Sequence, residues 1–190
     1  GTPKVSIERE WDDKSGELIL KIRQLIPSNN TSKKKEYLLI PLLLSLFNKE
    51  GKIFKEKLLI IDQEKQTFTI RGLPKEKNKP ILSLFRGFSA PVKWESDYLL
   101  EDLLYLFRCD DDPFSQWNAG QQLMRMALLQ RASSTPDIQL ENELIKTLKD
   151  LIVNLGPKDP ELLACLLTLP GMAELELSQI SSDPIALYEA

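Results

Sequence analysis

Few side chains in this sequence could act as nucleophiles, general bases or metal ligands. The chain contains no histidine, which excludes Ser-His-Asp and Cys-His nucleophile systems and a zinc site of the His-Glu-x-x-His type. Its two cysteines, Cys109 and Cys165, lie 56 positions apart and lack the Cys-x-x-Cys spacing of metal or redox sites. We expect both to be small, buried or half-buried residues in a reducing compartment rather than a disulfide.

The carboxylates offer two candidate groups. Asp110–Asp112 could be taken for a divalent-cation site, but such sites favour carboxylates at alternating positions, so a solvent-facing capping loop is preferred. Glu141 and Glu143 share neither a helix face nor a recognisable acid/base arrangement. An enzyme using carboxylates alone, such as a glycosidase, would need two of them across a cleft, about 5 to 9.5 Å apart. We therefore predict no catalytic, cofactor-binding or metal-binding residue here.

Two further groups favour structural roles over binding roles. Lys33–Lys35 could hold a phosphate or an acidic partner, but no aromatic residues are interleaved and a solvated loop is the better interpretation. Phe114, Trp117 and Met124 could line a ligand pocket. At helical spacing, however, they are more typical of a core or a domain interface.

Composition limits the class of protein. Of the 190 residues, 42% are hydrophobic and 28% charged, which is ordinary for a soluble globular protein. The net charge of −3 argues against nucleic-acid binding. The longest apolar segment, Tyr37–Phe47, is interrupted by Pro41 and Ser45 and is too short to span a membrane. No signal-peptide pattern opens the chain, so we expect a cytoplasmic protein. The missing initiator methionine predicts a piece excised from a longer chain.

The first half has the patterns of short strands separated by turns. Thr67 and Thr69 alternate with Phe68 and Ile70, as in a strand with one dry face. Gly16 is expected to supply a positive φ in a turn. Pro41 implies an edge position or a bulge. The expected strands are Lys4–Trp11, Glu17–Leu25, Tyr37–Phe47, Lys52–Ile61, Gln66–Leu73 and Pro80–Phe88.

The second half has helical periodicity. Ser96 is a candidate N-cap for a helix with an apolar stripe of leucines and Phe107. Three later helices are expected to start at Asp112-Pro113, Asp159-Pro160 and Asp183-Pro184, where the carboxylate caps the helix and proline occupies its first position. One more helix is expected over Ile138–Leu155, and the helix that starts at Asp159-Pro160 is expected to cover Glu161–Leu169.

These patterns predict a multi-domain β plus α fold. An immunoglobulin-like antiparallel β-sandwich is expected over residues 1–95, without the Cys…Trp…Cys signature of a true immunoglobulin domain. An α-helical bundle or superhelix is expected over residues 96–190. The change from strand period to helix period places the junction within Phe85–Leu123.

Three segments carry a resemblance to a known family. They are Phe88-Ser89-Ala90-Pro91-Val92, the run Asp112-Pro113-Phe114-Ser115-Gln116-Trp117-Asn118-Ala119-Gly120-Gln121, and Asp159-Pro160-Glu161-Leu162-Leu163-Ala164 leading to Leu167-Thr168-Leu169-Pro170. In this order and approximate spacing, the chain resembles bacterial aminopeptidase N over nearly its whole length. Gln116 departs from the arginine expected there, which puts a salt bridge at that point in doubt.

The resemblance implies part of a zinc-dependent exopeptidase that removes N-terminal residues from peptides. The implied parent has four domains, and this chain would be the β-sandwich plus the first helices of the last domain, which covers the active site. Its partners would be the parent's catalytic domain, the remaining C-terminal helices and, through the parent, peptide substrates. Zinc would be bound elsewhere in the parent.

None of the implied zinc ligands or substrate-amine residues has a counterpart here. The segment nearest to the parent's Gly-x-Met-Glu-Asn motif is Gly171-Met172-Ala173-Glu174, whose spacing is wrong, and we interpret it as a turn between helices. The alternative hypothesis is a free-standing interaction module without enzymatic activity, because sandwich folds carry many unrelated functions.

Overall fold

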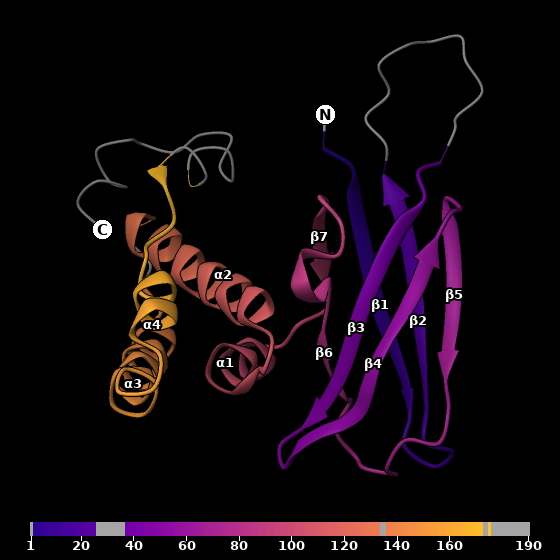
Figure 1. The fold of residues 1–190 in the computed structure, drawn as a ribbon, viewed down its shortest axis with the longest axis horizontal. Coiled ribbons are helices and arrows are strands. Elements are labelled where there is room, and N and C mark those ends of the chain that lie inside the picture. Colours follow the sequence, from indigo (N-terminus) through magenta and orange to yellow (C-terminus); the bar gives the residue numbers. More distant parts are fainter. Residues whose placement is uncertain (1, 26–36, 134–135, 173–174, 176–190) are drawn as a thin grey trace, which may run out of the picture. The chain divides into compact units, whose positions relative to one another are not determined.

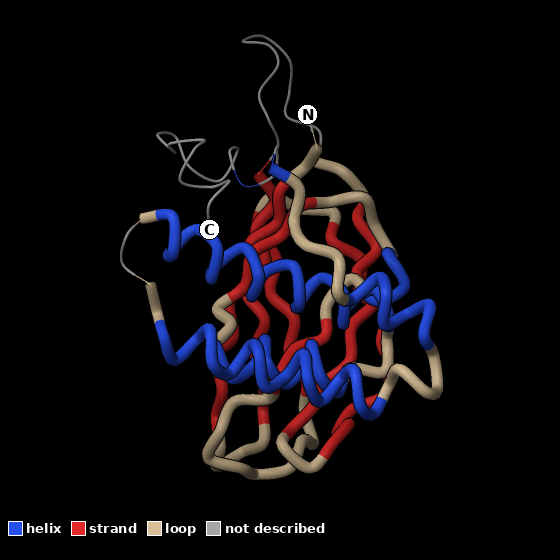
Figure 2. The backbone as a smooth tube through the Cα atoms, turned by 90° about the vertical axis from the view of Figure 1, so that its left-hand side faces the viewer, coloured by secondary structure: helices blue, strands red, loops and turns tan. Residues whose placement is uncertain are grey.

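The computed structural model describes residues 2–25, 37–133, 136–172 and 175, and it divides into two compact units, Gly1–Tyr98 and Leu99–Ala190. The first unit consists of strands and the second of helices (Figures 1 and 2). The elements of the first are β1 (Lys4–Asp12), β2 (Glu17–Leu25), β3 (Ile40–Asn48), β4 (Gly51–Ile61), β5 (Lys65–Ile70), β6 (Ile81–Ser83), the 3-10 helix η1 (Arg86–Phe88) and β7 (Lys93–Ser96).

The strands form two sheets, in the orders β5-β2-β1-β7 and β4-β3-β6. Alternate residues of β1 and β2 are buried, as expected when two sheets enclose one apolar core. The fully buried side chains of the two sheets include Ile7, Leu18, Leu20, Leu42, Leu44, Leu46, Ile61 and Leu82. The predicted Ig-like sandwich is confirmed. One pair is not antiparallel, because β7 runs parallel to β1, with Val5 opposite Trp94.

The β1–β2 hairpin depends on Gly16. Its φ is +71°, in the left-handed region that the turn pattern predicted. Its carbonyl accepts a hydrogen bond from the Leu73 amide at 3.1 Å. A Cβ atom at this position would lie 2.4 Å from the Leu73 carbonyl oxygen, so the close approach also requires glycine.

The end of the sandwich differs from the expected strand over Pro80–Phe88. Only Ile81–Ser83 is a strand, and η1 follows it. The strand cannot continue, since Phe85, Gly87 and Phe88 have φ values of 51°, 60° and 55°, outside the β region.

Pro41 lies in β3 where that strand has β4 on one side only. Pro41 is opposite Ile60 of β4, whereas β6 pairs with β3 only from Ser45 to Phe47. The Ser89 hydroxyl occupies the other side, accepting from the Leu43 amide and donating to the Pro41 carbonyl, both at 3.1 Å. The predicted edge position is therefore confirmed for this end of β3.

The helical unit contains α1 (Leu100–Cys109), α2 (Pro113–Ala132), α3 (Ile138–Asn154) and α4 (Pro160–Leu166). Asp112 and Asp159 cap their helices as predicted, accepting hydrogen bonds from the amides of Ser115 and Leu162 at 2.8 and 2.9 Å. The third expected start, Asp183-Pro184, lies outside the described residues. No described helix combines the length and hydropathy needed to cross a membrane.

Ser96 was predicted as the N-cap of the first helix, and this prediction is wrong. Ser96 is the last residue of β7, and the N-cap is Leu99. Parallel pairing with β1 keeps residues 93–96 extended, because Ser96 lies opposite Ile7 in the ladder. The helix can therefore begin only after the sheet ends.

Candidate functional site

The structure describes some of the residues weighed for chemistry and shows what they contact. Among the described residues, no cluster of three His, Cys, Asp or Glu side chains could hold a metal ion. Glu141 instead binds Arg131 through two hydrogen bonds, at 3.0 and 2.8 Å, and Arg131 holds the pKa of Glu141 below its ordinary value. Lys33–Lys35 lies outside the described residues, and of Gly171–Glu174 only the first two residues are described.

Cys109 and Cys165 are both free and both exposed. The prediction that they are unpaired is confirmed, and the prediction that they are buried or half-buried is wrong. The side chains that α1 buries are Asp102, Leu103, Leu106 and Phe107, and α4 buries Leu166. Each cysteine therefore sits on a helix beside buried residues but on an outward-facing position.

The three aspartates form a capping turn between α1 and α2. Asp110 accepts a hydrogen bond from the Asp112 amide at 2.9 Å, and Asp112 caps α2. The buried side chain of Gln116 donates to the Phe107 carbonyl at 2.9 Å. At position 116, where the family resemblance led us to expect arginine, a neutral glutamine amide thus pairs with a backbone carbonyl near the C-terminal end of α1.

Phe107 also explains a glycine inside α2. A Cβ at Gly120 would lie 2.5 to 2.9 Å from the Phe107 ring, so α1 and α2 can approach closely only with glycine there. Phe114 and Trp117 stack with ring centroids 6.0 Å apart, and Met124 is buried. These residues belong to the packing of the helical unit, as the preferred interpretation predicted.

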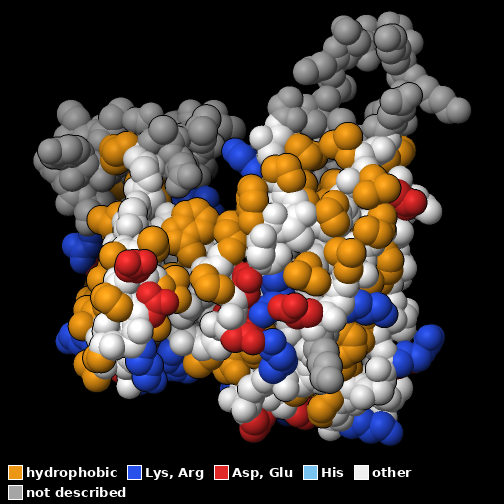
Figure 3. All heavy atoms as spheres, in the orientation of Figure 1, with side chains coloured by type: hydrophobic (Ala, Val, Ile, Leu, Met, Phe, Trp, Pro, Cys, Tyr) orange, Lys and Arg blue, Asp and Glu red, His pale blue; other side chains and the backbone are white. Residues whose placement is uncertain are grey.

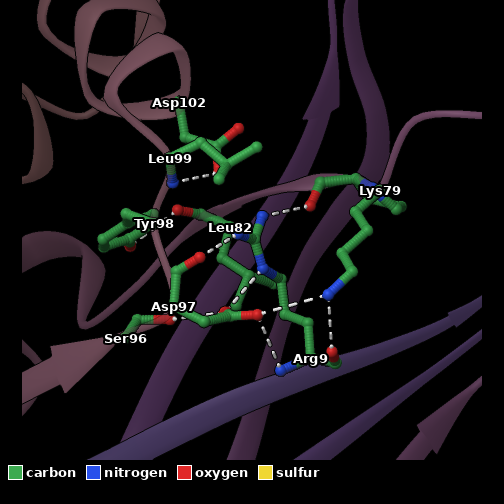
Figure 4. Close-up of polar contacts among 9 residues, drawn as sticks. Arg9, Lys79, Leu82, Ser96, Asp97, Tyr98, Leu99 and Asp102 are labelled. Atoms are coloured by element: carbon green, nitrogen blue, oxygen red, sulfur yellow. Dashed lines mark hydrogen bonds and ion pairs between the residues drawn. The ribbon is translucent and has the colours of Figure 1, made fainter.

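A polar group surrounds Arg9 near the last residues of the sandwich unit (Figure 4). Arg9 is on the inward face of β1, after Val5 and Ile7, and its side chain is 1% exposed. Its guanidinium donates to the Asp97 side chain at 2.8 Å, to the Asp97 carbonyl at 2.7 Å and to the Pro80 carbonyl at 2.9 Å. Burying this charge is tolerable because each bonded oxygen compensates its lost hydration.

Asp97 and Tyr98 complete the group. Asp97 also receives a hydrogen bond from the Arg9 amide and lies 3.6 Å from the Lys79 amine. The Tyr98 hydroxyl donates to the Leu82 carbonyl at 2.8 Å, and its ring lies 5.9 Å from the Arg9 guanidinium carbon. The last two residues of the sandwich unit are thus fixed to β1 and to the end of β6. We call Arg9, Lys79, Asp97 and Tyr98 the exit clamp.

The helical unit begins with its own restraint immediately after the exit clamp. The Asp102 carboxylate accepts a hydrogen bond from the Leu99 amide at 3.1 Å, and the Asp102 amide donates to the Leu99 carbonyl at 3.0 Å. This reciprocal arrangement satisfies amides that a helix start leaves unpaired. Hydrogen bonds therefore fix the backbone on both sides of the chain connection between Tyr98 and Leu99.

Sequence reasoning did not identify the exit clamp. The available signal was a charged residue at an inward position of a strand, because Val5, Ile7 and Arg9 share one face by alternation. A buried arginine requires several acceptors. Which residues supply them depends on the parallel β1–β7 pairing, and that pairing was not expected.

A second positioned group surrounds the 3-10 helix. Arg86 is buried, and its guanidinium donates to Glu56 at 2.7 Å and to the Ser83 hydroxyl at 2.8 Å. Positive φ values at two phenylalanines are rare and persist only where surrounding contacts fix the backbone. This loop opens the Phe88–Val92 segment on which the family resemblance partly rests.

Comparison with known proteins gives a consistent result for both units. Residues 1–97 match the family described as domain of unknown function (DUF3458) with an Ig-like fold, and residues 100–190 match DUF3458_C, described as ARM repeats. Proteins named aminopeptidase N from Caulobacter vibrioides and Haemophilus influenzae are 34% and 30% identical over the whole chain. A crystal structure of Legionella pneumophila aminopeptidase A in complex with aspartic acid matches with a TM-score of 0.80 and 30% identity over the whole chain.

The share of the relatives that is matched is small. This chain spans 22% and 23% of the two aminopeptidase N sequences and 21% of the crystallised chain. The similarity therefore concerns one segment of much longer polypeptides.

Proposed function

Because this chain belongs to the DUF3458 family of Ig-like domains and continues into the associated ARM-repeat domain, we propose that it is a non-catalytic segment of an aminopeptidase N-like zinc enzyme. In this proposal, residues 1–95 are a β-sandwich linker domain and residues 96–190 are the first helices of the C-terminal helical domain. The parent enzyme hydrolyses N-terminal residues from peptides. The observation that carries the proposal is a match over 100% of this chain and only 22% of its relative.

Zinc chemistry does not fit the residues of this chain. The chain has no histidine, and the described residues contain no metal-holding cluster. A catalytic zinc site needs three protein ligands with an open position. The zinc ligands and the catalytic base of the parent therefore belong to its catalytic domain.

The role assigned to this chain is mechanical. It joins the catalytic domain to the helical domain, and the exit clamp fixes the backbone from which the helices start. The parent's catalytic domain and its remaining C-terminal helices are the partners, and peptides are substrates only through the parent. Two free cysteines support a reducing, cytoplasmic location for the parent.

The test compares the natural gene product with the 190-residue chain. Both are purified and assayed with an aminoacyl-arylamide and added zinc. We expect the longer protein to release arylamine in a chelator-sensitive reaction and the chain alone to release none. Turnover by the rigorously purified chain would contradict the assignment. A natural gene encoding only these residues would instead favour the free-standing interaction module.

A further inference from the structure

The two sheets of the sandwich present very different outer faces. On the β5-β2-β1-β7 sheet, exposed positions of β1 and β2 include Glu8, Glu10, Lys21 and Arg23, and ion pairs link Lys21 to Glu10, Arg23 to Glu64 and Arg71 to Glu17. This is the pattern of an antiparallel sheet with its second face in water.

The β4-β3-β6 sheet does not follow this pattern. Leu43 lies opposite Leu58, and Pro41 lies opposite Ile60, so these four side chains share one surface. Leu39, two residues before Pro41, extends the same row. Leu39, Leu58 and Ile60 are 70%, 55% and 38% exposed, while their strand neighbours Leu59 and Ile61 are buried in the core. We call Leu39, Pro41, Leu43, Leu58 and Ile60 the β3–β4 outer face.

The space-filling view agrees with this assignment. Figure 3 shows hydrophobic side chains gathered over the part of the sandwich where β3 and β4 lie. Single exposed apolar residues are common, but a contiguous group on two paired strands usually marks a contact surface.

A bulky aromatic residue is fixed beside this face. Phe88 is 55% exposed and has a φ of 55°. The next residue, Ser89, is hydrogen-bonded to both Pro41 and Leu43 of the β3–β4 outer face. On the other side of Phe88, Arg86 is held by Glu56 and Ser83. A strained backbone that holds an aromatic side chain toward solvent suggests a preorganised contact.

We propose that the β3–β4 outer face, together with Phe88, packs against an apolar surface of another domain of the same, longer polypeptide. This inference rests on the proposed function. The first argument for a domain of the same polypeptide as the partner is chain length. This chain matches only 22% of its relative, so most of that polypeptide lies outside the matched residues. It also follows from chemistry, since the five central side chains carry no charge and therefore favour an uncharged, aliphatic or aromatic partner surface.

The experiment measures thiol accessibility at Leu58. Leu58→Cys is introduced into both the 190-residue chain and the longer natural protein, and labelling by a maleimide is followed by peptide mass spectrometry. Reading individual peptides separates this site from Cys109 and Cys165. Thr69→Cys is the matched control, because Thr69 is an exposed strand residue on the charged sheet.

We expect Leu58→Cys to label at least tenfold more slowly in the longer protein than in the chain, while Thr69→Cys labels at similar rates in both. Equal rates at Leu58 in a longer, active aminopeptidase would overturn this inference and leave the proposed function standing. A gene that encodes only residues 1–190 would overturn both.

Two further outcomes would assign the face to a different occupant and so overturn the inference. One is slow labelling in the chain itself at every concentration, which would indicate cover by its own helical unit. The other is protection that disappears on dilution, which would indicate a second copy. Leu58→Lys provides a separate check, because it should lower the melting temperature of the longer protein and leave that of the chain nearly unchanged.

Discussion

The Arg9 guanidinium and the Asp97 carboxylate are 2.8 Å apart although 88 residues separate them in the sequence. The contact joins the first strand of the sandwich to the residue that follows its last strand. Because Arg9 also binds the carbonyls of Asp97 and Pro80, one side chain fixes two points of the backbone near the chain's exit.

Removing the arginine should strongly destabilise the sandwich. Arg9→Ala leaves a carboxylate and two carbonyls without their donor, and breaking one partner of a buried pair typically costs about 3–5 kcal/mol. Asp97 is 29% exposed, so we expect the lower part of that range. Urea unfolding of the 190-residue chain measures the change in the free energy of unfolding.

The matched control is Lys21→Ala, which removes a cation from the neighbouring strand. Both side chains of the Lys21–Glu10 pair are about half exposed, and such pairs contribute roughly 0–1 kcal/mol. If Arg9→Ala destabilised the chain no more than Lys21→Ala, the exit clamp would have no structural importance.

Gly16 in the β1–β2 turn and Gly72 after β5 separate the cost of a left-handed backbone from the cost of crowding. Gly16 and Gly72 have nearly equal φ values, +71° and +75°, but only at Gly16 would a Cβ meet a neighbour, the Leu73 carbonyl. Gly72→Ala should cost about 1–2 kcal/mol for the left-handed conformation alone. Gly16→Ala should cost clearly more, since backbone must also move. Equal melting temperatures for the two variants would show that the turn accommodates the methyl group.

Much of the fold follows from residue patterns. Alternation in the first half and Asp-Pro capping in the second predicted the sandwich, the five strands β1 to β5 to within three residues at each end, and two helix starts. The end of the sandwich was predicted poorly because its conformation depends on distant partners. β7 is short and pairs with β1, Arg86 in the turn binds Glu56, and the Ser89 hydroxyl after the turn binds the Pro41 carbonyl.

The candidate site was harder to predict than the fold. The absence of histidine excludes nucleophiles of the Ser-His-Asp kind, but it identifies no positive role. The exit clamp and the β3–β4 outer face both arise from strand register, which sets which side chains become neighbours. Register across 88 residues cannot be obtained from local spacing.

Gln116 provides a test of how α1 and α2 are joined. Its buried amide donates a hydrogen bond to the carbonyl of Phe107, which lies in the last turn of α1. Gln116→Leu keeps a similar volume and leaves that carbonyl unpaired, at a cost of about 1–3 kcal/mol. Gln121→Leu is the control in the same helix, because its bond to the Thr168 carbonyl is exposed to solvent. Thermal unfolding should therefore separate the two variants; indistinguishable transitions would argue that the Gln116 bond contributes nothing.

The Arg131–Glu141 pair predicts the direction of a pH effect. Arg131 lowers the pKa of Glu141 in the folded state from its ordinary value of 4.5. Because the pKa is lower in the folded state than in the unfolded state, the ionised carboxylate stabilises the fold at pH values above the unfolded-state pKa. This stabilisation is lost as the pH falls through the folded-state pKa. Glu141→Gln should therefore lower the melting temperature at pH 7 and leave it almost unchanged near pH 2. Glu143→Gln removes the same charge from the same helix and serves as the control. A pH-independent difference between wild type and Glu141→Gln would mean that packing, rather than the charge on Glu141, accounts for the effect.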